Sequence, residues 1–154
     1  MGISPFVAAL RGFVGHQLLL LPSVAVLPWR EDGRLLCVRL ADTAQWATIG
    51  GAVEPDESPE DAARRETEEE AGIRVELQGI RAVLGGPPFR IRYPNGDETA
   101  YVSTVFDASI TSGVPQPDHD ETTAIGWFSP TELVGTDMSP FTRALLIGAR
   151  VIDG

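Results

Sequence analysis

The chain has 154 residues, of which 43% are hydrophobic and 22% are charged. These values are typical of one globular unit large enough to bury a core, so we expect a single domain over residues 1–154. The net charge of −10 argues against a nucleic-acid partner, because a phosphate backbone is repelled by an acidic surface. It does not exclude a small anionic ligand, since a bound metal ion can reverse the local field.

Nothing in the sequence predicts a membrane partner. The most apolar run near the N-terminus, residues 18–21, is far shorter than the roughly 20 residues that span a bilayer. No basic residue precedes Arg11, so the start lacks the charged region of a signal peptide. The single cysteine, Cys37, lies in an apolar run, where we expect a small core residue. We therefore expect a cytoplasmic protein.

The first third of the chain predicts a helix followed by strands. Ser4 and Pro5 are suited to begin a helix as N-cap and first residue, and Gly15 is suited to end it. Two apolar runs, residues 23–29 and 34–40, flank Asp32-Gly33, which is a strong hairpin signal. A further short strand is expected over residues 46–49, ending in a turn at the paired glycines 50–51.

The middle of the chain predicts one well-delimited helix. Ser58 and Pro59 begin it in the same way, and Gly72 stands where a C-terminal glycine belongs. Its uncharged stripe consists of small residues at i, i+4 and i+8, which would let the helix lie close to a sheet: Ala63, Thr67 and Ala71.

The rest of the chain predicts strands and two short helices. Strands are expected over residues 74–84, 89–93, 99–106 and 124–128, with a hairpin turn at Asn95-Gly96. Residues 109–121 are polar and contain two prolines, so we expect a loop there. Ser129-Pro130 and Ser139-Pro140 each begin a short helix.

Three glutamates share one face of the central helix. Glu66, Glu69 and Glu70 stand at i, i+3 and i+4, so they fall within an arc of roughly 100°. Like charges at this spacing repel each other. Such a face is stable if it is fully solvated or if a cation binds to it, and the surrounding motif favours the cation.

Residues 51–73 resemble the Nudix box, whose pattern is G-x5-E-x7-R-E-U-x-E-E-x-G-U, with U a bulky apolar residue. All seven fixed positions match, from Gly51 and Glu57 through Arg65-Glu66 to Gly72. The one departure is Thr67, where the pattern has a larger apolar residue. The resemblance implies an α+β Nudix fold, in which a mixed β-sheet lies between helices and the box forms a loop-helix-loop.

The resemblance also implies a chemistry, the hydrolysis of a nucleoside diphosphate linked to another group, with Mg²⁺ or Mn²⁺ as cofactor. Such a metal neutralises phosphate oxygens and acidifies a bound water. The implied ligands are carboxylates of the helix and a backbone carbonyl: Glu66, Glu69, Glu70 and Gly51. Arg65 is expected to orient Glu57 or Glu69. The general base is open among Glu66, Glu69 and Glu121.

The sequence determines the substrate less closely than it determines the type of reaction. Candidates for a substrate pocket are Arg39, Arg92, Tyr93, Tyr101 and Glu121. Pro88, fifteen residues after Ile73, resembles a marker of ADP-ribose-cleaving relatives but also suits a plain strand breaker. ADP-ribose, nucleotide sugars and nucleoside triphosphates all stay open. The resemblance further implies a homodimer.

Two other classes of function compete with the hydrolase. The first is a Nudix-fold module that binds a nucleotide without cleaving it, although a sensor would not need the complete set of carboxylates. The second is an acidic interaction domain, suggested by the net charge alone. Turnover of a nucleotide distinguishes the enzyme from both.

Overall fold

The structure, a computed structural model, describes residues 3–154. Within that range the helices are α1 (Pro5–Val14), α2 (Pro59–Ala71), the short 3-10 helix η1 (Pro87–Phe89), α3 (Pro130–Val134) and α4 (Pro140–Gly148). The strands are β1 (Leu19–Pro28), β2 (Leu35–Leu40), β3 (Trp46–Ala47), β4 (Ile49–Ala52), β5 (Arg74–Leu84), β6 (Arg90–Arg92), β7 (Glu98–Ser112) and β8 (Thr122–Phe128). No helix within residues 3–154 is long and apolar enough to cross a membrane.

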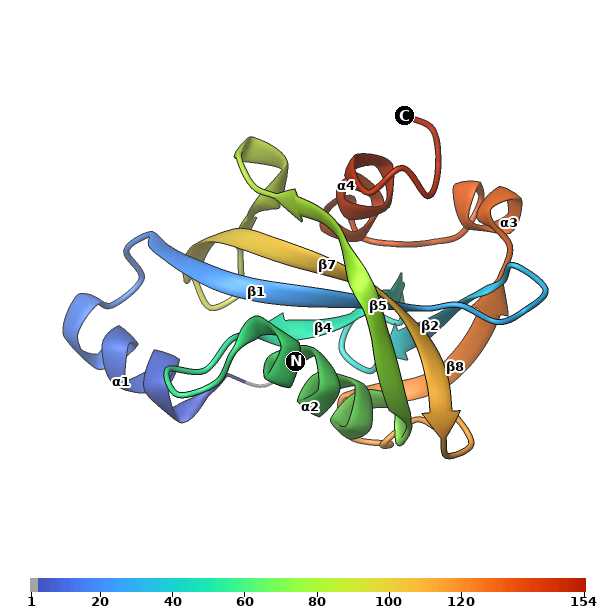
Figure 1. The fold of residues 1–154 in the computed structure, drawn as a ribbon. Coiled ribbons are helices and arrows are strands. Elements are labelled where there is room, and N and C mark those ends of the chain that lie inside the picture. Colours follow the sequence, from blue (N-terminus) through green and yellow to red (C-terminus); the bar gives the residue numbers. More distant parts are fainter. Residues whose placement is uncertain (1–2) are drawn as a thin grey trace.

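The strands form two sheets (Figure 1). The larger has the order β4-β1-β7-β5, with β6 paired to β7. β1 and β7 run parallel, from the pair Leu19–Thr99 to the pair Pro28–Ala108, while the other pairs in this sheet are antiparallel. The smaller sheet, β3-β2-β8, is antiparallel. The predicted α+β class and mixed sheet are confirmed, and the second sheet is an addition.

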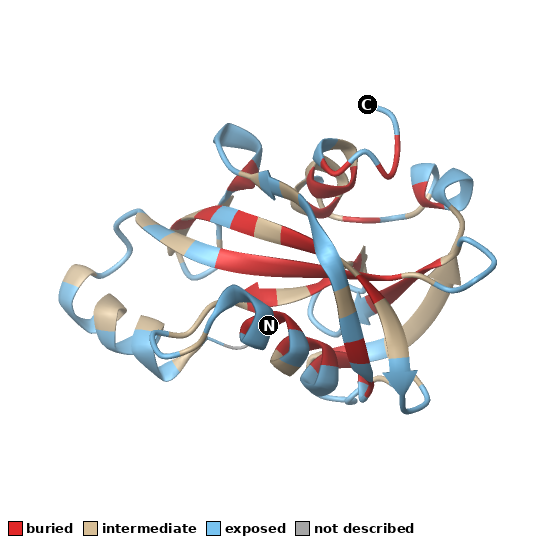
Figure 2. Ribbon diagram, viewed as in Figure 1, coloured by how far each residue is buried: buried red, intermediate tan, exposed pale blue. Residues whose placement is uncertain are grey.

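The larger sheet lies between α2 on one side and α4 on the other (Figure 1). Because side chains alternate along a strand, β1 feeds both sides. Ala25 and Leu27 pack in the cluster that includes Leu145 of α4, and Val24 and Val26 pack in the cluster that includes α2. Burial on both faces explains the continuous apolar run of β1, which is red from its middle to its C-terminal end in Figure 2.

Each of the four α-helices begins with the predicted Ser-Pro pair. The serine hydroxyl accepts a hydrogen bond from a backbone N–H three residues later, which satisfies one of the unpaired donors of the first turn. The capping serines are Ser4, Ser58, Ser129 and Ser139. At the far end of α2, Gly72 has the left-handed conformation expected of a C-cap glycine.

The predicted hairpin at Asp32-Gly33 is only partly correct. The turn forms, with the Gly33 N–H donating to the Arg30 carbonyl oxygen at 3.0 Å. However, β1 and β2 belong to different sheets, and Trp29–Leu35 is an isolated bridge between the segments that flank the turn. The strands separate because each is buried and pairs with other strands, an arrangement that local turn chemistry does not determine.

The single strand predicted over residues 46–49 is also wrong, as is the glycine turn after it. β3 and β4 belong to different sheets, and Gly50 and Gly51 lie inside β4, opposite Ala25 and Val24. A Cβ atom on Gly50 would lie 2.3 Å from the Val24 carbonyl oxygen. Glycine is therefore needed there for the close approach of two backbones, not for a turn.

The polar segment expected to be a loop over residues 109–121 is partly strand. β7 continues to Ser112 and pairs with β5 along this part. Its last two residues, Thr111 and Ser112, are exposed, so their polarity reflects exposure rather than a break in the strand. The loop proper occupies residues 113–121.

We expect Gly50→Ala to lower the free energy of unfolding by about 1–3 kcal/mol, the usual cost of overpacking, because a backbone oxygen cannot move aside. Gly12→Ala is the matched control. A Cβ on Gly12 meets nothing within 4 Å, and alanine favours a helix, so this variant should be neutral or slightly stabilising. Urea denaturation measures both, and equal stability of the two variants would contradict the steric argument.

Candidate functional site

The carboxylates of α2 are positioned by the packing of the helix on the sheet. The small stripe Ala63, Thr67 and Ala71 is fully buried, as the sequence predicts. Glu66 and Glu70 flank this stripe and are only 5% and 3% exposed. Glutamate is rarely so buried without a partner or a metal, so these two side chains mark a candidate site.

Arg65 connects the carboxylates to the loop before the helix. Its guanidinium donates to both oxygens of Glu57, at 3.0 and 2.6 Å, and to the Ala52 carbonyl oxygen at 3.1 Å. Its Nη1 atom also donates to Glu66 at 2.9 Å and to Glu69 at 3.3 Å. Arg65 therefore fixes the box loop, the helix and the end of β4 relative to one another, and Glu57 anchors this arginine.

The two buried carboxylates are electrostatically unfavourable as they stand. Burial raises the pKa of Glu66 to about 7, an effect that Arg65 partly offsets. Burial, followed by the charge of Glu66, raises the pKa of Glu70 well above its usual range. The Gly50 N–H donates to Glu70 at 2.9 Å and opposes that shift. A cation between the two side chains would remove the repulsion.

Glu121 reaches the same region from the loop before β8. The Asp118 side chain accepts hydrogen bonds from the backbone N–H groups of Glu121 and Thr122, each at 2.9 Å. The Thr122 hydroxyl in turn donates to the Glu70 carbonyl oxygen at 3.2 Å. The loop is thus tied to the last turn of α2, and Glu121 adds negative charge near Glu66.

Most of the predicted site residues line two cavities next to β4, and Glu57, which bonds to Arg65, lines neither. The carboxylate cavity, about 610 Å³, is lined by Arg65, Glu66, Glu69, Glu121, Ala52, Glu54 and residues 3–6. The inner cavity, about 250 Å³, lies beneath α4. Its lining includes Gly50, Gly51, Glu70, Tyr93 and Tyr101, with Ser23, Asp42, Ile91, Ser103, Phe141, Thr142 and Leu145.

The chemistry of these residues suits a divalent metal. Among residues 3–154 no three His, Cys, Asp or Glu side chains converge on one point that could hold an ion. Mg²⁺ does not require such a cage, because it is usually held by one or two carboxylates, waters and substrate phosphates. Glu66 and Glu70, buried one turn apart, fit that role on charge and ligand type. The Gly51 carbonyl stays a predicted ligand.

Two of the predicted substrate residues lie apart from these cavities. Arg39 is exposed, and its Nε atom donates to the Ala44 carbonyl oxygen at 2.9 Å. Arg92 is exposed on the edge strand β6. Neither lines the carboxylate cavity or the inner cavity. Their polarity reflects solvent exposure in alternating strands.

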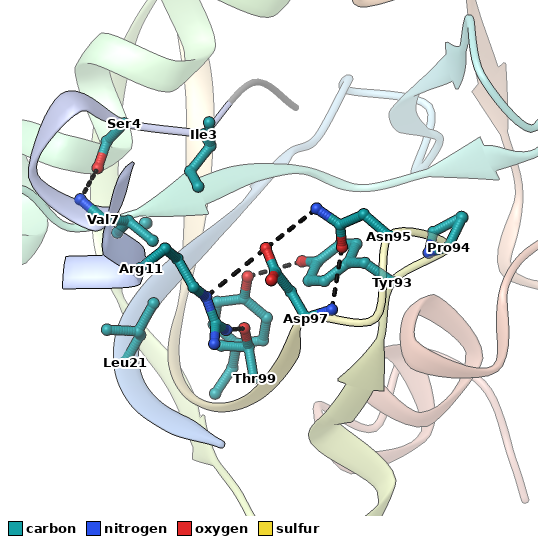
Figure 3. A pocket seen from close by; sticks show the side chains of 12 residues that line it. Ile3, Ser4, Val7, Arg11, Leu21, Tyr93, Pro94, Asn95, Asp97 and Thr99 are labelled. Atoms are coloured by element: carbon teal, nitrogen blue, oxygen red, sulfur yellow. Dashed lines mark hydrogen bonds and ion pairs between the residues drawn. The ribbon is translucent and has the colours of Figure 1, made fainter. Parts of the chain in front are cut away.

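A third cavity, about 370 Å³, lies between α1 and the turn after β6 (Figure 3). Arg11 of α1 points into it but is already engaged: it donates to the Glu98 carbonyl oxygen at 2.7 Å and lies 3.6 Å from Asp97. Arg11 therefore holds α1 against the turn, and few of its N–H groups are available to bind a phosphate. Ile3 and Ser4 line both this cavity and the carboxylate cavity, so the start of α1 forms part of the site wall.

Sequence reasoning missed several residues around the site. Ser23, Phe141 and Thr142 line the inner cavity, and residues 3–6 line the carboxylate cavity. The sequence does contain a feature that indicates Ser23, because it is a lone polar residue in an otherwise apolar stretch of β1. No feature of the sequence indicates Phe141 or Thr142, since their position depends on how α4 docks on the sheet.

Known proteins are similar to this chain over most of its length. The family model described as the NUDIX domain matches residues 19–146. A MutT-like protein of Streptomyces ambofaciens is 40% identical over 72% of this chain, which spans 65% of that protein. Nucleoside triphosphatase NudI of Escherichia fergusonii is 32% identical over 76% of this chain and 88% of its own length.

A solved structure supports the same relationship. The crystal structure of a MutT NUDIX hydrolase from Burkholderia pseudomallei superposes with a TM-score of 0.70 and 29% identity. The match covers 84% of this chain and 98% of that one. The agreement therefore extends over most of this chain, well beyond the 23 residues of the motif.

We expect Arg65→Gln to lower the free energy of unfolding by about 2 kcal/mol, because it breaks several charged hydrogen bonds and leaves Glu57 without this partner. Arg64→Gln is the matched control on the same helix. Arg64 makes one exposed ion pair, with Asp61, so its replacement should change stability by less than about 0.5 kcal/mol. Chemical denaturation measures both, and similar losses would contradict the role given to Arg65.

Proposed function

The chain belongs to the NUDIX domain family, and from this we propose that it hydrolyses the pyrophosphate bond of a nucleoside diphosphate linked to another group. The observation that carries the proposal is the buried pair Glu66 and Glu70 on the helix of a complete Nudix box. Arg65 offsets only part of the cost of burying these two carboxylates, so their presence supports a metal-dependent reaction. Mg²⁺ or Mn²⁺ is the proposed cofactor.

Each residue of the site has a proposed task. Glu66 and Glu70 hold the metal, with the Gly51 carbonyl as a further ligand. Arg65 keeps Glu66 and Glu69 in place through its anchor on Glu57. When bound, the metal supplies neutralisation of the phosphate oxygens and a more acidic water. The general base is one of Glu66, Glu69 and Glu121, which line the same cavity.

Nucleoside triphosphates are the substrates to test first. NudI, which shares 32% identity with this chain, is named a nucleoside triphosphatase. The ADP-ribose marker is weaker here, because Pro88 lies in η1, whose Phe89 packs edge-on against Phe141. Pro88 thus has a structural explanation. ADP-ribose and nucleotide sugars serve as the comparison substrates.

A substrate panel tests the proposal directly. The protein is incubated with Mg²⁺ or Mn²⁺ and each nucleotide class in water labelled with heavy oxygen, and mass analysis locates the label in the products. We expect cleavage of a pyrophosphate bond and label on one of its two phosphorus atoms. Tight nucleotide binding without turnover would favour the sensor, and no thermal shift with metal or nucleotide would favour the interaction domain.

We expect Glu66→Gln and Glu70→Gln each to lower kcat/KM more than about 100-fold. Replacing a residue that only holds a metal ligand in place already lowers activity by up to about 100-fold, and replacing the ligand itself should lower it at least as much. Glu68→Gln is the matched control. Glu68 stands on the same helix but is exposed and pairs only loosely with Arg74, at 4.0 Å, so its variant should keep its activity. Full activity in either site variant would overturn the assignment.

The general base can be identified by comparing Glu66→Gln, Glu69→Gln and Glu121→Gln. Loss of the base should lower kcat with little change in the metal concentration that gives half-maximal activity, because the ligands stay in place. Loss of a ligand should raise that concentration. If all three variants raise it and none lowers kcat at saturating metal, none of the three is the base.

The homodimer implied by the family resemblance stays a prediction. Helix α1 buries none of its residues, and Phe13 is 90% exposed. Light scattering of the purified protein at several concentrations measures its mass directly.

A further inference from the structure

The inner cavity contains a hydroxyl group that lacks a hydrogen-bond partner. Ser23 is 6% exposed, and within residues 3–154 its Oγ is the one buried side-chain nitrogen or oxygen found without a partner. Buried polar groups are nearly always paired, because leaving one unpaired is costly in free energy. Ser23 lines the inner cavity, so a bound ligand is the natural partner.

The walls of the inner cavity select an uncharged ligand group. Among the residues that the structure describes, no arginine or histidine lines it, and its acidic residues are Glu70 and Asp42. A phosphate placed deep in it would meet no positive side chain. Its apolar walls include Ile91, Phe141 and Leu145, which suit a flat ring.

The size and position of the cavity suggest which end of a nucleotide it receives. At about 250 Å³ it is smaller than the roughly 300–1,000 Å³ of sites that enclose a whole drug-sized ligand. Gly51 and Glu70 form part of its lining, so one side of it borders the proposed metal site. A nucleotide whose phosphates lie at the metal site can place its base here.

Two tyrosines add a second hydrogen-bonding group. The hydroxyl oxygens of Tyr93 and Tyr101 lie 2.7 Å apart, and both residues line the cavity. Burial raises the pKa of Tyr93, so this hydroxyl stays protonated at neutral pH. One hydroxyl donates to the other, which leaves one proton of the pair available to a ligand.

We propose that Ser23 is a specificity-determining residue, whose hydroxyl forms a hydrogen bond with a polar group of the substrate's nucleobase in the inner cavity. The orientation of the phosphates rests on the proposed function, but the contact itself requires no turnover. A site built to pair with a polar group discriminates against ligands that lack it, because its own group is then left unpaired. Ser23 would thereby favour some bases over others.

The test compares Ser23→Ala with the natural protein and with Ser112→Ala, an exposed serine near the end of β7. Binding of the four nucleoside 5′-monophosphates is measured by calorimetry in EDTA, so that neither metal nor hydrolysis contributes. We expect the preferred monophosphate to bind Ser23→Ala about tenfold more weakly, which is the loss of one hydrogen bond. Ser112→Ala should bind it like the natural protein.

Kinetics and stability complete the test. With the substrate found in the panel, Ser23→Ala should raise KM about tenfold and leave kcat nearly unchanged. The rise in KM should be equal for the ribo and 2′-deoxy forms of the substrate. A rise confined to the ribo form would overturn the assignment of the contact to the base. The Tm of Ser23→Ala should be no lower than that of the natural protein. A marked drop would make Ser23 a structural residue and overturn the proposal.

The two proposals fail in different ways. If no nucleotide is hydrolysed but Ser23→Ala weakens monophosphate binding, the hydrolase proposal fails and the role of Ser23 stands. If nucleotides are hydrolysed and Ser23→Ala changes neither binding nor KM, the role of Ser23 is overturned and the hydrolase stands.

Discussion

The structure depends on the burial of two acidic side chains beside the face of α2 that packs against the sheet. Glu66 and Glu70 are held there because the stripe beside them, Ala63, Thr67 and Ala71, is small enough for α2 to lie flat on the strands. The helix cannot turn the carboxylates to solvent without exposing that stripe. The packing of the core therefore keeps the carboxylates buried despite the electrostatic cost of burying them. A bound cation would lower that cost.

Arg65 limits the cost while no cation is bound. It shares its guanidinium among Glu57, Glu66 and Glu69, so part of the negative charge is neutralised from the loop side. Glu70 accepts a hydrogen bond from the Gly50 N–H instead. The same strand thus needs glycine for its close approach to β1 and supplies a backbone donor to the most buried carboxylate. Fold and site share these constraints.

The sequence predicts best what local chemistry determines. The Ser-Pro starts, the C-cap at Gly72 and the buried stripe of α2 follow from interactions within a few residues, and the structure confirms them. Prediction from the sequence fails where contacts between residues far apart in the chain determine the structure. Asp32-Gly33 specifies a turn but not the sheet each strand joins, and Gly50-Gly51 has the composition of a turn yet lies within a strand. Phe141 lines the inner cavity only because α4 docks above it.

In the proposed function, the division of charge between the two cavities orients the nucleotide. The carboxylate cavity is strongly charged and would gain affinity for phosphates through a bound cation, whereas the inner cavity has mostly apolar and hydroxyl-bearing walls. A ligand with a charged end and a neutral ring can satisfy both at once in only one direction. In the proposed arrangement the hydroxyl of Ser23, unpaired in a stretch of β1 that is otherwise apolar, takes its hydrogen-bond partner from the ring. The proposed ring contact and the proposed metal ligand therefore lie on neighbouring strands, since β1 carries Ser23 and pairs directly with β4, which carries Gly51.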